Sequence, residues 1–91
     1  ILDPGFGFAK TLEQNYQLMR ELDRFSEFGK RVLVGVSRKS MIFRKFGITP
    51  EESLPETQVL HYKSLCKGAD ILRVHDVAEA VRTVELYRTL E

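Results

Sequence analysis

Three short apolar runs alternate with amphipathic segments along the chain. The runs occupy residues 1–2, 32–36 and 71–74, and they are bounded by glycine or charged positions. Runs of this kind, rich in β-branched residues, are typical of strands buried on both faces of a parallel sheet. Because helical patterns separate and follow them, the order strand–helix–strand–helix–strand–helix predicts a parallel α/β architecture.

The first helical pattern has clear signals at both ends. Thr11 and Gln14 fit a capping box, and Gly29 stands where a helix C-terminus favours a left-handed residue. Between them an apolar stripe at the helical period runs through Leu12, Tyr16, Met19, Leu22 and Phe25.

Two further helices are predicted downstream. Thr49, Pro50 and Glu52 form an N-terminal signal, after which the helix restarts at Pro55 and runs to Gly68. We expect its apolar face to carry Val59, Tyr62 and Cys66. The last helix opens at Asp76, as its cap, with Glu79 behind it, and its apolar stripe consists of Val77, Val81, Val84 and Tyr87.

Composition narrows the functional classes. A chain of 91 residues with 43% hydrophobic and 30% charged positions forms one small domain, and its net charge of +1 gives no pull toward nucleic acid. No run is long and apolar enough to span a membrane, and no secretory signal is present. The single Cys66 excludes an internal disulfide, which favours a reducing, cytoplasmic location. We expect Cys66 to be a core thiol and His61 to be a surface or packing residue.

The start of the chain suggests a piece of a longer protein. The first residue is not Met, and residues 1–2 resemble the end of a strand rather than a whole one. We therefore expect the first strand to be truncated.

A charged residue follows each predicted strand. Asp3, Lys39 and Arg73 are 36 and 34 positions apart, about one βα unit each. In a (β/α)8 barrel the strand C-termini converge on one mouth, where active sites form. A doubly wound sheet also gathers its ligands at strand C-termini, so the spacing alone does not choose between the two folds.

The loops around these residues suit an anionic ligand. Gly5 and Gly7 allow a tight turn or a close approach to a ligand. Lys39 and Ser40 stand at a helix start, where anions bind. Arg73 and His75 alternate, so they project to the same side and could hold a phosphate or pyrophosphate. The alternative is a solvated arginine and a histidine bonded to a neighbouring carbonyl.

The three loops together resemble a known family. Residues 3–8 (DPGFGF), 35–40 (GVSRKS) and 73–77 (RVHDV), with GADI at 68–71, are similar to the C-terminal motifs of dihydropteroate synthases in order and separation. The resemblance covers the whole chain. It implies one partial domain over residues 1–91, formed by about the last three βα units of a TIM (β/α)8 barrel. It also implies a folate-pathway transferase that joins p-aminobenzoate to a 6-hydroxymethyl-7,8-dihydropterin pyrophosphate and releases pyrophosphate.

The resemblance assigns roles to individual motif positions. In the family pattern Lys39, Arg73 and His75 are catalytic, and Arg73 and His75 also hold the pyrophosphate, with magnesium expected in the whole enzyme. The pterin site takes Asp3, Gly35 and Lys39, and the p-aminobenzoate site, which is the sulfonamide target, takes Phe8, Arg38 and Ser40.

The sequence departs from the family pattern before the third strand. An arginine followed by Gly-Thr or Gly-Ser is usual there, whereas this chain has Ser53, Pro55 and Glu56-Thr57. Because a whole barrel needs about 250 residues, we expect the isolated chain to be inactive.

Two other readings stay open. One is a pterin- or phosphate-binding barrel piece, related to pterin-dependent methyltransferases, that has no synthase activity. The other is a self-associating module, since strand edges without partners favour a homodimer or a swapped oligomer.

Overall fold

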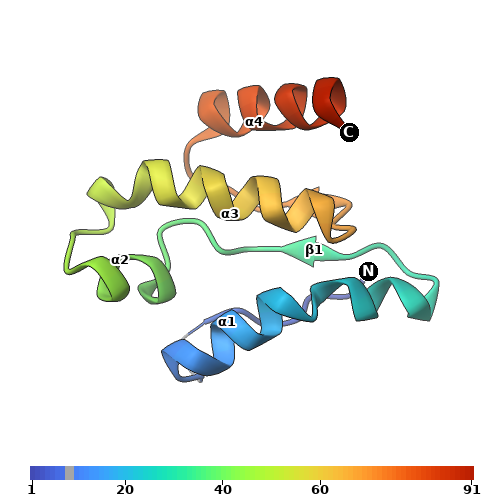
Figure 1. The fold of residues 1–91 in the computed structure, drawn as a ribbon, viewed down its shortest axis with the longest axis horizontal. Coiled ribbons are helices and arrows are strands. Elements are labelled where there is room, and N and C mark those ends of the chain that lie inside the picture. Colours follow the sequence, from blue (N-terminus) through green and yellow to red (C-terminus); the bar gives the residue numbers. More distant parts are fainter. Residues whose placement is uncertain (8–9) are drawn as a thin grey trace.

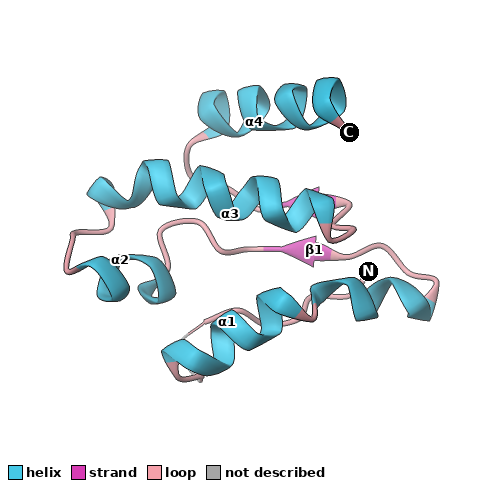
Figure 2. Cartoon of the chain, viewed as in Figure 1, coloured by secondary structure: helices cyan, strands magenta, loops and turns pink. Residues whose placement is uncertain are grey.

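A computed structural model describes residues 1–7 and 10–91. Within these residues the chain forms four α-helices and two short strands joined by loops. Figures 1 and 2 show their arrangement. In chain order the elements are α1 (Leu12–Arg20), the 3₁₀ helix η1 (Leu22–Phe28), β1 (Leu33–Val34), α2 (Ser40–Phe46), the 3₁₀ helix η2 (Glu51–Ser53), α3 (Leu54–Cys66), β2 (Ile71–Leu72) and α4 (Val77–Leu90).

The strands are parallel, as the sequence predicts, but they are shorter than the apolar runs. β1 pairs with β2, with Val34 opposite Leu72, and Leu2 forms a parallel bridge with Val32. The last bond between the two strands runs from the Arg73 N–H to the Val34 carbonyl, at 2.9 Å. Beyond this point both segments turn into the loops that carry the charged residues.

Helices that are distant in the sequence contact one another. Ser64 Oγ of α3 lies 3.7 Å from Met19 Sδ of α1, and Thr83 of α4 donates a hydrogen bond of 2.8 Å to Gln58 of α3. In the view of Figure 1, α4, α3, β1 and α1 follow one another from top to bottom. Among the residues that the structure describes, no helix has the length and apolarity needed to cross a membrane.

The hydrophobic core lies between the strands and these helices. Its centre is formed by Val32, Val34 and Val36, all at 1% exposure or less. It is completed by Phe6, Met19, Leu22, Met41 and Ile42. Every second residue of the segment around β1 is therefore buried, as expected where helices cover a face of a strand.

The predicted helix ends are confirmed where the signal is local. Thr11 and Gln14 form the capping box of α1, and Gly29 ends η1 at φ +68°. The Thr49 hydroxyl accepts from the Glu52 N–H at 3.2 Å, and the Glu52 carboxylate accepts from the Thr49 N–H at 2.9 Å. α1 is shorter than its stripe predicts, because it ends at Arg20 and continues as the 3₁₀ turn η1.

The buried faces of α3 and α4 differ from the predicted ones. α3 buries Thr57, His61 and Ser64, whereas Val59 and Cys66 are exposed. The expectation that Cys66 is a core thiol is therefore wrong, while His61 is a packing residue. The small hydroxyl side chains allow α3 to lie against helices on two sides. The Ser64 hydroxyl donates a hydrogen bond of 2.7 Å to the Leu60 carbonyl of its own helix.

α4 is rotated in a similar way. It buries Ala80 and Thr83 against α3, while Val77 and Val81 are 63% and 55% exposed. The predicted stripe of α4 faces a groove of about 480 Å³ beside β2 instead of the core. Apolar spacing therefore located this helix but not the face that it buries.

Candidate functional site at the strand ends

The structure brings together two of the three charged residues that follow the strands. Asp3 Oδ2 lies 3.6 Å from Arg73 Nη1, and both side chains are partly exposed. Asp3 Oδ1 also accepts a hydrogen bond of 2.9 Å from the Gly5 N–H, which fixes the carboxylate at the start of its loop. An ion pair this exposed adds little stability, so its position at the strand ends matters more than its energy.

Gly35 makes room for the Arg73 side chain. A Cβ atom at Gly35 would lie 2.6 Å from Arg73 Nη2 and 3.0 Å from Arg73 Cζ. The guanidinium therefore lies directly against the backbone of the neighbouring strand end. Only glycine allows this approach, which gives the first residue of the GVSRKS motif a clear structural purpose.

Lys39 reaches the first loop from the start of α2. Its ammonium group donates a hydrogen bond to the Phe6 carbonyl, and its backbone is extended at φ −80°. Burial lowers the pKa of Lys39 and the Arg73 guanidinium lowers it further, while the Asp3 carboxylate opposes both. Two cations thus share one mouth with a single carboxylate, which favours an anionic or acceptor-rich ligand.

A small hollow adjoins Lys39. It has a volume of about 310 Å³ and is lined by Phe6, Gly7, Lys39 and Ser40. Ser40 is the first residue of α2, so it borders this hollow as well as the helix start. Phe8, which the family pattern assigns to the p-aminobenzoate site, lies outside the described residues.

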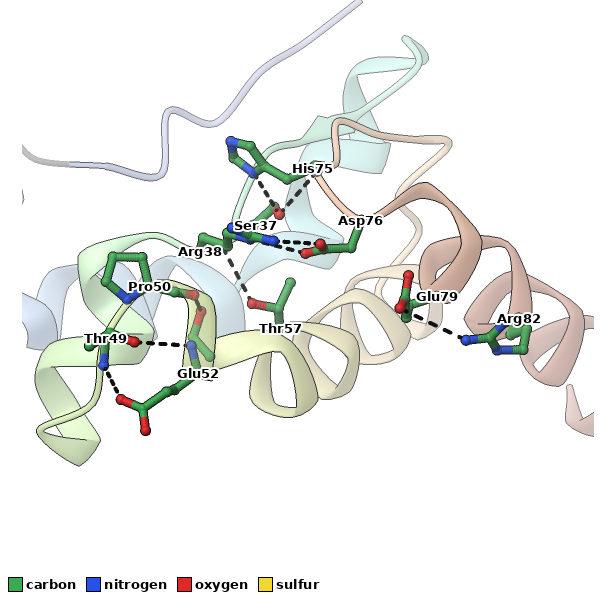
Figure 3. Close-up of polar contacts among 11 residues, drawn as sticks. Ser37, Arg38, Thr49, Pro50, Glu52, Thr57, His75, Asp76, Glu79 and Arg82 are labelled. Carbon is green, nitrogen blue, oxygen red and sulfur yellow. Dashed lines mark hydrogen bonds and ion pairs between the residues drawn. The ribbon is translucent and has the colours of Figure 1, made fainter.

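Ser37 holds the fourth candidate residue, His75. The buried Ser37 hydroxyl lies 2.8 Å from His75 Nδ1 and accepts from the His75 N–H at 3.2 Å. Figure 3 shows both contacts. Arg73 thus lies over Gly35 and His75 over Ser37, the alternation that the sequence predicts. His75 is bonded to a hydroxyl rather than to the carbonyl of the alternative interpretation.

Arg38 forms the strongest polar contact in the region. Its Nη2 and Nε atoms donate to Asp76 Oδ1 and Oδ2 at 2.6 and 3.1 Å (Figure 3). The Arg38 guanidinium holds the pKa of Asp76 below its usual value, and Asp76 raises the pKa of Arg38 in turn. The guanidinium is thus engaged at the start of α4.

The expectation that Asp76 caps α4 is only half right. Asp76 stands at the N-cap position, but its side chain makes no capping hydrogen bond. Both carboxylate oxygens instead face the Arg38 guanidinium, so the side chain is turned toward the neighbouring loop.

Asn15 is a residue that the sequence pattern did not reveal. Its side chain is 2% exposed and bonds both the N–H and the carbonyl of Gly7, each at 3.2 Å. It therefore fixes the DPGFGF loop to α1. The sequence feature that could have indicated this role is an asparagine within the apolar stripe of a helix, because a buried polar side chain needs hydrogen-bond partners.

The described residues were also compared with what a metal ion requires. Among them no group of three or more His, Cys, Asp or Glu side chains is placed to hold a metal ion. Asp3 is the carboxylate that pairs with Arg73 and whose charge acts on Lys39. Magnesium prefers several oxygen ligands, so these residues alone do not fit a direct magnesium site.

The chain is similar to several dihydropteroate synthases. The chain is 45% identical over all 91 residues to a dihydropteroate synthase of Escherichia coli K12, of which it covers 31%. Over 97% of its length the chain is similar to a Yersinia pestis dihydropteroate synthase in a sulfonamide drug complex, with 39% identity and a TM-score of 0.94. The match covers 32% of that chain. The present chain matches 99% of its length, at 40% identity and a TM-score of 0.93, to 35% of a Thermus thermophilus dihydropteroate synthase chain in complex with 4-aminobenzoate.

The fold and the strand-end residues define a parallel α/β chain that carries one carboxylate and two cations in the loops after its strands. The model of the pterin binding enzyme family matches residues 1–75, and the chain belongs to this family. The chain has the fold of the last three βα units of a TIM barrel, and it spans about a third of the length of the curated relatives that it matches.

Proposed function

We propose that this chain forms part of the substrate site of a dihydropteroate synthase. The reaction joins the amino group of p-aminobenzoate to the hydroxymethyl carbon of 6-hydroxymethyl-7,8-dihydropterin pyrophosphate and releases pyrophosphate. The observation that carries the proposal is the Asp3–Arg73 pair, with Lys39 close enough for its pKa to respond to both charges, in loops of the pterin binding family.

The pterin ring is the ligand of Asp3 and Lys39 in this proposal. A pterin edge presents adjacent N–H donors, which one carboxylate can accept together, and acceptors within reach of an ammonium group. Gly35 contributes by allowing Arg73 to lie close beside them. The depressed pKa of Lys39 reflects a site that is partly shielded from water, where such hydrogen bonds are stronger.

The departing pyrophosphate is the ligand of Arg73 and His75. Cleavage of the C–O bond places negative charge on this group, and cationic donors already in position stabilise the charge as it forms. A magnesium ion would be held mainly by pyrophosphate oxygens, since these loops offer it few ligands of their own.

In this proposal the p-aminobenzoate site is the hollow beside Ser40, and the family resemblance adds Phe8, which lies outside the described residues. The aniline nitrogen is a competent nucleophile once it is oriented, so positioning matters more here than a strong base. The same site would take sulfonamides in place of p-aminobenzoate. Arg38 acts on this region through its loop, because its guanidinium is bonded to Asp76.

Partners and location follow from the same proposal. The partners are the two small substrates and a second copy of the chain, without nucleic acid or membrane. The exposed thiol of Cys66 suits a reducing compartment such as the cytoplasm.

Calorimetric titration of 6-hydroxymethyl-7,8-dihydropterin pyrophosphate into the 91-residue chain tests the assignment. Lys39→Ala and Arg73→Ala should each weaken binding by roughly tenfold or more, about 1.4 kcal/mol. Arg82→Ala is the matched control, because it removes an exposed arginine paired with Glu79 on α4. Failure of a folded chain to bind, or equal losses in all three variants, would overturn the proposal.

The isolated chain should show no turnover of the two substrates. Its relatives are about three times as long, and the remainder of a barrel mouth is needed to enclose both ligands. A coupled assay for pyrophosphate release by the purified chain measures this directly. Catalysis that survives rigorous purification and disappears in Arg73→Ala would contradict the expectation.

A further inference from the structure

Arg38 has a backbone conformation that its side chain disfavours. Its φ angle is +54°, the one positive value that the described residues show outside glycine. For a residue with a Cβ atom this left-handed conformation is energetically unfavourable. The conformation persists only where the surrounding structure enforces it. The Thr57 hydroxyl of α3 accepts from the Arg38 N–H at 3.3 Å, and Asp76 binds its guanidinium.

Asp76 gives up a helix cap to make this contact. An aspartate at the N-cap normally accepts from the first N–H groups of its helix. Here both of its oxygens bind Arg38, and the two side chains are only 15% and 30% exposed. A sheltered bidentate pair is stronger than an exposed one, so it can fix the relative position of the two loops.

A second connection joins the same two loops one residue earlier. Ser37 binds both the N–H and the ring of His75, so residues 37 and 38 hold residues 75 and 76 in register (Figure 3). Lys39 comes next in the chain, and its N–H closes the turn on the Val36 carbonyl at 3.1 Å. The residues on either side of the Arg38–Asp76 pair are therefore Lys39 and His75.

We propose that Arg38 and Asp76 are positioning residues that make the 37–39 loop and the 73–76 loop move as one unit. This inference rests on the proposed function, in which Lys39 contacts the pterin and His75 the pyrophosphate. Through the Arg38–Asp76 pair, an anion bound at Arg73 and His75 strengthens binding of a pterin at Asp3 and Lys39. By linkage the pterin strengthens anion binding by the same factor.

Hydrogen exchange of the ligand-free chain tests the mechanical part. Asp76→Ala breaks the ion pair by removing the carboxylate. Arg38→Gly breaks it by removing the guanidinium, and glycine adopts the left-handed conformation without strain. Both should speed exchange of the Lys39 and His75 amides by about tenfold while the buried Met19 amide of α1 stays unchanged. Unchanged rates at Lys39 and His75 would overturn the proposal.

Linkage titrations test the coupling between the two ligands. If the Arg38–Asp76 pair had only a structural role, its loss would not change this coupling. The Kd of inorganic pyrophosphate is measured with and without saturating pteroic acid. We expect its ratio to be about fivefold or more in the unaltered chain and in the Arg82→Ala control, and close to one in Asp76→Ala and Arg38→Gly.

Each outcome of the titrations has a definite meaning. Binding of both ligands without coupling in the unaltered chain, or coupling that persists in the two variants, overturns the inference. Absence of binding by either ligand, together with the expected change in exchange, overturns the proposed function and leaves the positioning role standing.

Discussion

At the residue scale, the contact between Gly35 and Arg73 separates ligand binding from stability. Gly35→Ala places a methyl group 2.6 Å from Arg73 Nη2, so the guanidinium must leave its position beside Asp3. Gly35 has no left-handed backbone angle, and the displaced group is the end of a flexible side chain. We expect pyrophosphate binding to weaken by roughly tenfold in calorimetry, with the free energy of unfolding changed by less than about 1 kcal/mol.

Gly29→Ala is the matched control for Gly35→Ala, because its effect should be the reverse. Gly29 ends η1 at φ +68° with open space around it, so a side chain there meets backbone strain and nothing else. We expect a loss of about 1 kcal/mol of stability with unchanged ligand binding. Equal effects of both substitutions on pyrophosphate affinity would contradict the role assigned to Gly35.

A second prediction at this scale concerns acid stability. His61 is fully buried, and its Nε2 has no hydrogen-bond partner among the described residues. Burial lowers the pKa of His61, although the Asp76 charge opposes this in part. The unfolded chain then binds a proton more readily than the folded chain as the pH falls below about 6.5. Stability contributed by neutral His61 is present above that pH and is lost below it.

Urea unfolding at roughly pH 7.5 and roughly pH 5.5 measures this loss. The unfolding midpoint should be lower at the acidic pH in the unaltered chain, and the difference should shrink in His61→Gln. The chain's other histidine is the exposed His75, which is left unaltered in both proteins. An equal dependence in His61→Gln and the unaltered chain would refute the argument.

Individual site residues differ in how far the sequence reveals them. The location of Asp3, Lys39 and Arg73 in the loops after the strands could be predicted because such loops have a fixed place in a parallel α/β fold, while their roles stay predictions. Ser37 and Asp76 could not, because their partners His75 and Arg38 lie 38 positions away in the chain. No local pattern distinguishes an N-cap aspartate from one that binds a distant arginine.

At the element scale, the ends of helices were predictable and their buried faces were not. The Thr11–Gln14 and Thr49–Glu52 pairs depend only on residues three positions apart, and both form as expected. The face that α3 buries depends on two neighbouring helices. Its exposed Val59 and its buried His61 therefore reverse the hydrophobic rule at these two positions.

The connection between α1 and the first loop gives the prediction at this scale. Asn15→Ala removes a side chain that is 2% exposed, and it leaves the N–H and carbonyl of Gly7 without their side-chain partner. We expect a loss of about 2 kcal/mol in urea unfolding and faster exchange of the Gly7 amide. The exposed Gln17→Ala on the same helix is the control and should change stability by less than about 0.5 kcal/mol.

At the scale of the whole molecule, the described part of the chain leaves apolar surface beside β2. The groove there is lined by Leu72 and Val74 of the strand segment and by Val77 and Val81 of α4. Within the described residues β2 has β1 as its strand partner on one side. A strand edge next to exposed apolar side chains favours pairing with another chain.

We therefore expect the 91-residue chain to self-associate through this groove. Sedimentation velocity should show a weight-average sedimentation coefficient that rises with concentration. Val81→Lys places a charge in the groove and should shift the chain toward monomer. Leu90→Lys is the matched control, because Leu90 is an exposed apolar residue of the same helix that does not line the groove. A chain that stays monomeric at every concentration would rule out self-association, and an equal effect of both lysines would place the contact elsewhere on α4.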